Sequence, residues 1–261
     1  MPIVNGIEAF RDAMANHDDE YVLIGGGACS ILFDAVGDSF RMTKDLDIIV
    51  LTDVRRGGGF ASDFWAFIKQ NGYESWKQAD GACAYYRFNL PQDSTRLLQV
   101  PEQIELFARH PDFALEDEDS VIAPLHFDEG VSSLSAIILD DGYYEFIRSH
   151  VTIVGGVPLL MPLHIIPLKM RAHIDLNQKH QDGCHVNERD LTKHRKDVAD
   201  LSRLLAPDDV LPLQGQMRED AELFLVDFEQ YVRRETSRKR RHQLEEDLQT
   251  LRQTYLSRTQ R

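Results

Sequence analysis

The sequence has little cysteine and no long apolar run. Its three cysteines, Cys29, Cys83 and Cys184, are widely spaced and form no Cys-x-x-Cys pair. This argues against a disulfide framework and a structural zinc site, and it is typical of a reducing compartment. No apolar stretch approaches the roughly 20 residues that cross a bilayer, and residues 1–6 do not resemble an export signal. We therefore expect a soluble, cytoplasmic protein without a membrane partner.

Positive charge is also scarce. The chain has 29 Lys and Arg against 43 Asp and Glu, which gives a formal net charge of -14. A net charge of this sign opposes long-range attraction to nucleic acid. Residues 233–241 (RRETSRKRR) are an exception, with six basic side chains and one acid. This run is either a local patch for a phosphate backbone or, more commonly, the solvated face of a helix.

The first half of the chain alternates between short apolar runs and helical spacing. Four consecutive apolar residues, 21–24, lead into three glycines, and a helical pattern follows over 28–36. The remaining pattern predicts strands at 45–51, 84–89 and 103–108, a polar turn at 52–59 and helices at 5–17 and 60–71. We therefore expect an α+β fold, a nucleotidyltransferase-like mixed sheet flanked by helices, with a catalytic domain at residues 1–128.

The second half is predicted to be mainly helical. Helices are expected at 132–149, 162–176 and 188–205, with a small hairpin at 151–160. Residues 214–261 read as almost wholly helical, with two apolar stripes that are out of phase across the basic run. A bend or helical hairpin is therefore expected there, and the stripes indicate packing within the chain or a homodimer through these helices. The resulting division is a helical domain at 129–213 that completes the cleft, and a helical tail at 214–261.

Three glycines, Gly25, Gly26 and Gly27, stand between the first strand and its helix. At such a junction, backbone N–H groups and the helix N-terminus can hold phosphate. Glycine lets the backbone approach a charged ligand closely because it has no Cβ. A plain strand-to-helix turn is an equally good interpretation of the glycines alone.

Asp45 and Asp47 make the phosphate interpretation more specific. Alternate residues of a strand share a face, so both carboxylates point the same way. Like charges this close favour a cation between them, and Mg²⁺ prefers carboxylate oxygens together with substrate phosphate. A dinucleotide site is the competing interpretation, because Gly25-x-Gly27-x-x-Ser30 nearly matches that fingerprint. There, however, the acid should close its strand, whereas Asp45 and Asp47 open theirs.

The run Gly25-Gly-Gly-Ala28, followed by Arg41-Met-Thr-Lys-Asp-Leu-Asp47, resembles the nucleotidyltransferases of the AbiEii toxin group, within the polymerase-beta-like superfamily. The family pattern is a glycine pair, a helix, and then Arg-x-Ser/Thr-x-Asp-apolar-Asp. The resemblance spans roughly residues 20–205. The segment at 32–40, between glycines and acids, is longer than in the family.

The resemblance implies a third acid on a neighbouring strand, and Glu105 supplies it. A lone Glu among apolar strand residues is costly to bury unless it is satisfied, and a metal shared with Asp45 and Asp47 would satisfy it. The family also carries a lysine on one helix and an Asp-x-x-Asp helix after it. Lys169 would therefore contact nucleotide phosphates and Asp197 would support the cleft, although such residues are usually surface pairs.

The implied activity is transfer of a nucleoside monophosphate from an NTP, with Mg²⁺ or Mn²⁺ as cofactor. The acceptor is left open: an RNA such as tRNA, a protein or a small molecule. The resemblance also implies a toxin of a toxin–antitoxin or abortive-infection system, with an antitoxin partner. The alternative is a nucleotidyltransferase fold that no longer catalyses and acts as a binding or regulatory protein. The remaining nucleotide-binding residues expected at the mouth of the site are Ser30, Arg41, Thr43 and Lys44.

Overall fold

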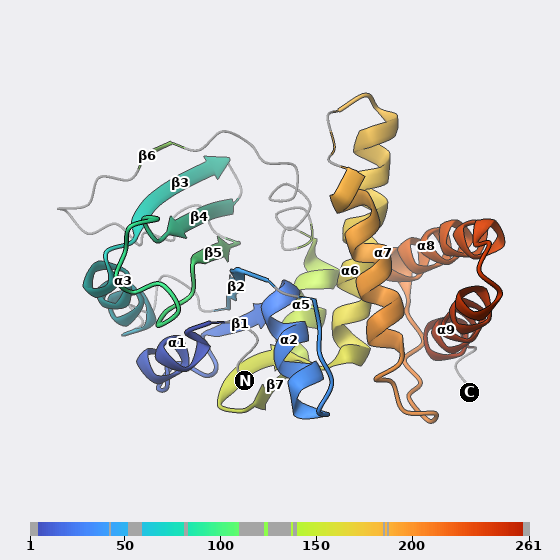
Figure 1. Cartoon of the computed structure of the whole chain (residues 1–261), viewed down its shortest axis with the longest axis horizontal. Helices are drawn as coiled ribbons and strands as arrows, with labels where there is room; N and C mark the ends of the chain where they lie inside the picture. The colour runs from blue at the N-terminus through green and yellow to red at the C-terminus, as the bar shows by residue number, and fades with distance from the viewer. Residues whose placement is uncertain are drawn as a thin grey trace. The chain divides into compact units, whose positions relative to one another are not determined.

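The computed structural model describes residues 5–41, 43–51, 59–80, 83–109, 123–124, 137, 140–184, 186 and 188–257, without the side chains of 76–80, 83–85, 123–124, 188 and 191. The chain divides into two compact units (Figure 1). The first unit is Met1–Phe127 with Ile147–Met161, and the second is Asp128–Phe146 with Pro162–Arg261. In the described parts of the chain, no helix combines the length and apolar character needed to span a membrane.

The first unit is built on a mixed eight-stranded sheet with the order β6-β3-β4-β5-β2-β1-β8-β7 (Figure 1). β1 pairs antiparallel with β2, whereas β2 pairs parallel with β5. This sheet, with the helical region that follows it, confirms the expected α+β class. The strands are β1 (Tyr21–Ile24), β2 (Asp45–Val50), β3 (Glu74–Asp80), β4 (Cys83–Asn89), β5 (Gln103–Ala108), β6 (Ala123–Pro124), β7 (Val151–Val154) and β8 (Val157–Leu160).

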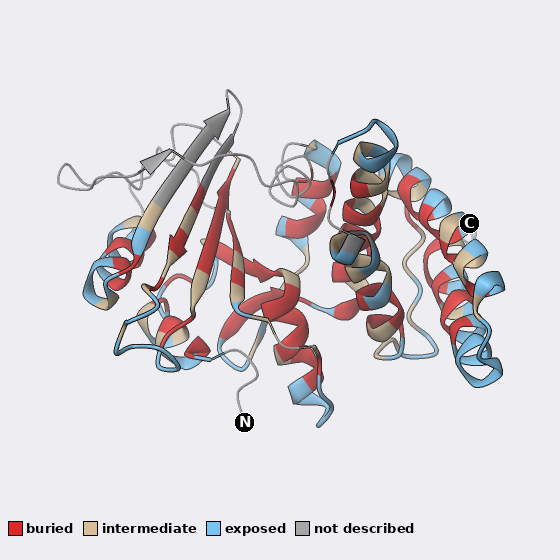
Figure 2. Ribbon diagram, turned by 45° about the horizontal axis from the view of Figure 1, so that its top comes forward, coloured by how far each residue is buried: buried red, intermediate tan, exposed pale blue. Residues whose placement is uncertain are grey.

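Three helices pack on one face of this sheet: α1 (Ile7–Ala13), α2 (Gly25–Ala35) and α3 (Gly59–Asn71). Tyr21 of β1 contacts Phe10 of α1 edge-on, with ring centroids 5.8 Å apart, and stacks on Phe60 of α3 at 5.6 Å. Phe64 of α3 lies 5.3 Å from Phe88 of β4. Figure 2 shows the resulting buried core along the central strands. Because side chains alternate across a strand, the acids of β2 and β5 point to the opposite face.

Most elements of this unit follow the sequence pattern. The strand at 103–108 and the hairpin at 151–160 are confirmed, and α3 begins one residue earlier than expected. β3 was not predicted, since ESWKQAD is too polar to show an apolar alternation. The turn expected at 52–59 lies, except for its last residue, outside the described residues.

The hairpin joins the first unit, not the helical domain expected at 129–213. Leu23 of β1 pairs with Leu159 of β8 in parallel register. All four residues of β1 and all four of β8 are buried, so the pairing covers an apolar edge that would otherwise present unpaired backbone groups.

The second unit is helical. α8 and α9 are separated by residues 235–237, and Ser237 caps α9 by accepting a hydrogen bond from the Arg240 backbone N–H; the bend expected at the basic run is therefore confirmed. α8 packs against α6 and α9, so residues 214–256 belong to this unit and do not form a separate tail. Its helices are the start of α5 (Asp141–Ser149), α6 (Pro162–Gln181), α7 (Glu188–Ser202), α8 (Gly215–Arg234) and α9 (Arg238–Leu256).

Both apolar stripes of α8 and α9 contribute to the interior of this unit. Phe224, Phe228, Leu251 and Tyr255 are fully buried. Their burial within one chain confirms the interpretation that these stripes serve internal packing; the homodimer stays a prediction.

Candidate functional site

The three predicted acids lie on two adjacent strands. β2 and β5 pair in parallel, and the register places Asp47 opposite Glu105 and Asp45 opposite Gln103. Directly paired residues share a face of the sheet, and so do residues two apart on one strand. The sheet therefore brings Asp45, Asp47 and Glu105 to one face, opposite the packed helices. Asp45 and Asp47 are half-buried, within reach of a ligand.

The glycine turn lies directly against these acids. Gly25 opens α2 with φ +67°, in the left-handed region, where side chains are disfavoured. A Cβ on Gly25 would come within 1.7 Å of Asp47 Oδ2, and a Cβ on Gly26 within 2.8 Å of Thr43 Oγ1. The absence of both side chains therefore lets the start of α2 reach the Asp47 carboxylate and the Thr43 hydroxyl. Free backbone N–H groups at a helix start attract anions.

Two other predicted contacts take different positions. Gly27 faces the sheet, since a Cβ there would lie 3.3 Å from Leu46 Cδ1; it allows close helix-to-strand packing. Ser30 is one turn further along α2 and 1% exposed, and its Oγ has no hydrogen-bond partner among the described residues. A hydroxyl buried in this way is not presented to a phosphate at the helix start, so the structure does not support the donor role expected of Ser30.

Glu105 is paired by an arginine that the sequence pattern did not single out. Its Oε1 accepts hydrogen bonds from Arg87 Nε at 2.9 Å and Gln103 Nε2 at 2.7 Å, and Arg87 Nη2 lies at 2.8 Å. Both partners of the ion pair are largely buried. A metal shared with Asp45 and Asp47 was expected to satisfy this carboxylate; Arg87, opposite Glu105 in β4, already pairs with it, and the shared metal stays a prediction. A lone arginine in the apolar run Tyr86-Arg87-Phe88 was the available signal.

The donor set fits a divalent cation in part. Asp45 and Asp47 offer two carboxylates of the kind that Mg²⁺ prefers, beside a helix start suited to phosphate. Among the described residues, however, no three His, Cys, Asp or Glu side chains already converge as a ligand group. The Glu105 carboxylate is oriented by Arg87 and Gln103. Asp45 and Asp47 are therefore the residues that would hold the ion, and Glu105 is the adjacent acid.

The two basic residues before Asp45, Arg41 and Lys44, make different contacts. The Arg41 guanidinium lies over the Phe40 ring, 5.2 Å from its centroid. Lys44 is exposed, and its Nζ donates a hydrogen bond to Glu102 Oε2 at 2.7 Å. This hydrogen bond raises the pKa of Lys44, which therefore carries its charge at the surface near Asp45. Met42, between them, lies outside the described residues.

The two residues predicted from the second half form a buried pair. Lys169 Nζ donates a hydrogen bond to Asp197 Oδ2 at 2.7 Å, and the two residues are only 5% and 0% exposed. The pair links α6 to α7 within the second unit. A lysine so buried and so paired is placed to stabilise the packing of two helices, and the phosphate contact expected of Lys169 is not what this geometry offers.

Comparison of the chain with protein-family models, with curated proteins and with solved structures finds no match in any of the three. The resemblance to the AbiEii group therefore rests on the motif residues alone.

Proposed function

We propose that the chain is a metal-dependent nucleotidyltransferase that transfers a nucleoside monophosphate from an NTP to an acceptor. One observation supports this above all: the α2 glycine turn lies against the Asp47 carboxylate, since a Cβ added to Gly25 would come within 1.7 Å of Asp47 Oδ2. A phosphate held at the start of α2 would thus lie beside Asp45 and Asp47. Neither feature would carry the proposal alone.

The roles follow from this placement. The backbone N–H groups at Gly25 and Gly26 would bind the triphosphate, and the partial positive charge of the helix start would favour it. Asp45 and Asp47 would hold Mg²⁺ or Mn²⁺, which when bound supplies charge neutralisation for the phosphates and activation of the acceptor hydroxyl. The exposed ammonium of Lys44 would attract the incoming NTP.

Glu105 would act from a fixed position. Arg87 and Gln103 both hold Oε1, which keeps the carboxylate on the acid-bearing face. In the proposed reaction it would orient the acceptor hydroxyl or share the cation with Asp47.

The test is label transfer. The protein is incubated with each NTP labelled at the α-phosphate, Mg²⁺ or Mn²⁺, and total RNA or cell lysate as acceptor. We expect transfer from at least one NTP, and loss of at least about 100-fold in Asp45→Asn/Asp47→Asn, as expected for a catalytic electrostatic contribution of a few kcal/mol. A wild-type protein that transfers no more label than this variant with every acceptor would overturn the proposal.

The ion pair of Glu105 favours a second candidate, a nucleotidyltransferase fold that binds nucleotide without transfer. An acid neutralised by Arg87 is less available as a metal ligand. A thermal-shift titration and the label-transfer assay together separate the two candidates. Binding of Mg²⁺-NTP should raise the melting temperature in either case, whereas only the enzyme should transfer label. Stabilisation without label transfer identifies the binding protein.

A toxin role is the finer part of the proposal, and it rests on the resemblance. Induced expression of the wild-type chain should then slow bacterial growth, and the Asp45→Asn/Asp47→Asn variant, expressed to the same level, should not. Equal growth of the two cultures would remove the toxin role and leave the transferase proposal intact.

A further inference from the structure

A basic pocket lies within the second unit, on helices that the proposed nucleotide site does not use. It has a volume of about 650 Å³, a size typical of small-ligand pockets. Five cationic side chains line it, against a single carboxylate, Asp200. The three arginines among them are ion-paired with carboxylates, Arg195 with Asp227, Arg203 with Asp200 and Asp247, and Arg240 with Glu235 at 3.2 Å. Among the described residues, the two lysines therefore supply the uncompensated positive charge of the pocket, in a chain whose net charge is -14. The five cations are Lys193, Arg195, Lys196, Arg203 and Arg240.

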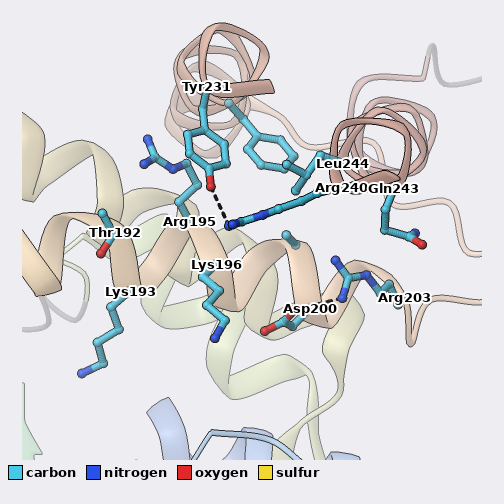
Figure 3. A pocket seen from close by; sticks show the side chains of 12 residues that line it. Thr192, Lys193, Arg195, Lys196, Asp200, Arg203, Tyr231, Arg240, Gln243 and Leu244 are labelled. Carbon is cyan, nitrogen blue, oxygen red and sulfur yellow. Dashed lines mark hydrogen bonds and ion pairs between the residues drawn. The ribbon is translucent and has the colours of Figure 1, made fainter. Parts of the chain in front are cut away.

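Three of these cations are held in place by the fold. Arg195 lies over the Tyr231 ring, 4.0 Å from its centroid, and its Nη1 is 3.3 Å from Asp227. Arg240 donates a hydrogen bond to the Tyr231 hydroxyl at 2.8 Å (Figure 3). These contacts fix two guanidinium groups around one aromatic ring, so a ligand would lose little side-chain entropy by binding them.

Arg203, the third arginine of the pocket, is held by two ion pairs. Its Nη1 lies 3.0 Å from Asp200 Oδ1, and its Nη2 lies 2.8 Å from Asp247 Oδ2. Figure 3 shows Arg203 and Asp200 near the end of α7, away from Arg195 and Tyr231. The arginines are thus spread along the pocket and oriented by their partners.

The two lysines are not committed in this way. Lys193 and Lys196 follow each other by three residues on α7, and neither makes a hydrogen bond or ion pair with a residue that the structure describes. Two ammonium groups at this spacing lie on one helix face. They are available to an anion from solvent.

We infer that the α7–α8–α9 pocket binds a small ligand with clustered phosphate groups. Phosphate suits guanidinium and ammonium donors together. The ring of Tyr231 is covered by Arg195 on one face and stacks with Phe228, whose centroid is 6.3 Å away; the pocket therefore offers charge and not a free platform for a base. A concave pocket in an acidic chain also favours a small anion over a long polyanion, which the net charge repels.

The experiment titrates inorganic tripolyphosphate by calorimetry, in EDTA and in an Asp45→Asn/Asp47→Asn background, so that no metal ion assists binding at the proposed nucleotide site. Any metal-free binding to the backbone N–H groups of that site would not depend on Lys193 and Lys196. We expect saturable binding that weakens at least tenfold in Lys193→Ala/Lys196→Ala. The matched control is Arg238→Ala/Lys239→Ala, which removes the same charge from exposed positions of α9 outside the pocket and should change the affinity less than threefold.

Three results would overturn the inference. One is the absence of saturable tripolyphosphate binding in the background variant. Another is an equal loss of affinity in the pocket and control variants, which would indicate a general charge effect. The third is binding of a 20-nucleotide single-stranded RNA that depends on Lys193 and Lys196 when tripolyphosphate does not bind, which would make the surface a nucleic-acid site.

Discussion

Replacing Gly25 with alanine perturbs the contact on which the proposed site depends. The new Cβ would meet Asp47 Oδ2 at 1.7 Å, and the residue would have to keep φ near +67°. The left-handed backbone alone costs a residue with a Cβ about 1–2 kcal/mol. Moving the Asp47 side chain off its rotamer adds about 1 kcal/mol. We therefore expect Gly25→Ala to lower the free energy of unfolding by about 2–3 kcal/mol and to impair binding of Mg²⁺-NTP.

The chain offers a matched control for this change. Gly37 has φ +76°, and a Cβ there would meet nothing within 4 Å, so Gly37→Ala carries the backbone cost without the clash. Both tryptophans, Trp65 and Trp76, belong to the first unit. A denaturant titration in which tryptophan fluorescence is the recorded signal therefore reports the unfolding of that unit.

A double-mutant cycle isolates the contact itself. In an Asp47→Ala background the carboxylate is gone and only the Cβ of residue 47 stays close, 3.1 Å from the added Cβ. Gly25→Ala should therefore cost clearly less there than in the wild type, and close to what Gly37→Ala costs. If Gly25→Ala and Gly37→Ala cost the same in the wild type, or if Asp47→Ala relieves nothing, the turn does not press on Asp47 and the reasoning for the site fails.

Two further predictions concern buried charges. Lys169→Met should lower the free energy of unfolding of the second unit by about 3–5 kcal/mol, because it leaves Asp197 buried without its cation. The double variant Lys169→Met/Asp197→Leu should recover most of the lost stability. Circular dichroism of the helices during denaturation measures the stability of both variants. Burial disfavours the charged form of His17, but hydrogen bonds with Asp63 and Glu20 outweigh it and raise its pKa above 6.5. The resulting stabilisation is fully present below pH 6.5 and is lost as pH rises through the raised pKa; His17→Gln should remove this pH dependence from fluorescence-detected melts, and a wild type that gains stability over this range would contradict the assignment.

The acids could be predicted from the sequence because their signal is local. Asp45 and Asp47 are two residues apart in an apolar run, and the alternation of side chains along a strand is enough to place both on the same face of the sheet. Glu105 was expected on a neighbouring strand because the family resemblance implies a third acid and the short apolar run at 103–108 contains one; its position opposite Asp47 comes from the structure. For Asp45 and Asp47, the residues that decide the geometry are neighbours along the chain.

The rest depends on contacts between distant segments. Nothing near Glu105 in sequence shows that β4 will bring Arg87 against it, because strand register is set by the whole sheet. Lys169 and Asp197 likewise look like ordinary helix charges until α6 and α7 pack. The pocket cations come from α7, the turn that follows it and α9, and the basic run at 233–241 indicated only one of them, Arg240.

The pairing of β1 with β8 also has consequences for the synthesis of the chain and for the choice of fragments to express. β1 is synthesised before residues 128–146, and its parallel neighbour at residues 157–160 is synthesised after them. While the residues between β1 and β8 are being synthesised, the apolar edge of β1 stays uncovered, and an uncovered edge is prone to aggregation. A fragment ending near residue 128 would keep that edge open permanently, whereas one extended through residue 161 would close it. The shortest fragment worth expressing for studies of the first unit alone is therefore set by the hairpin and not by the acids.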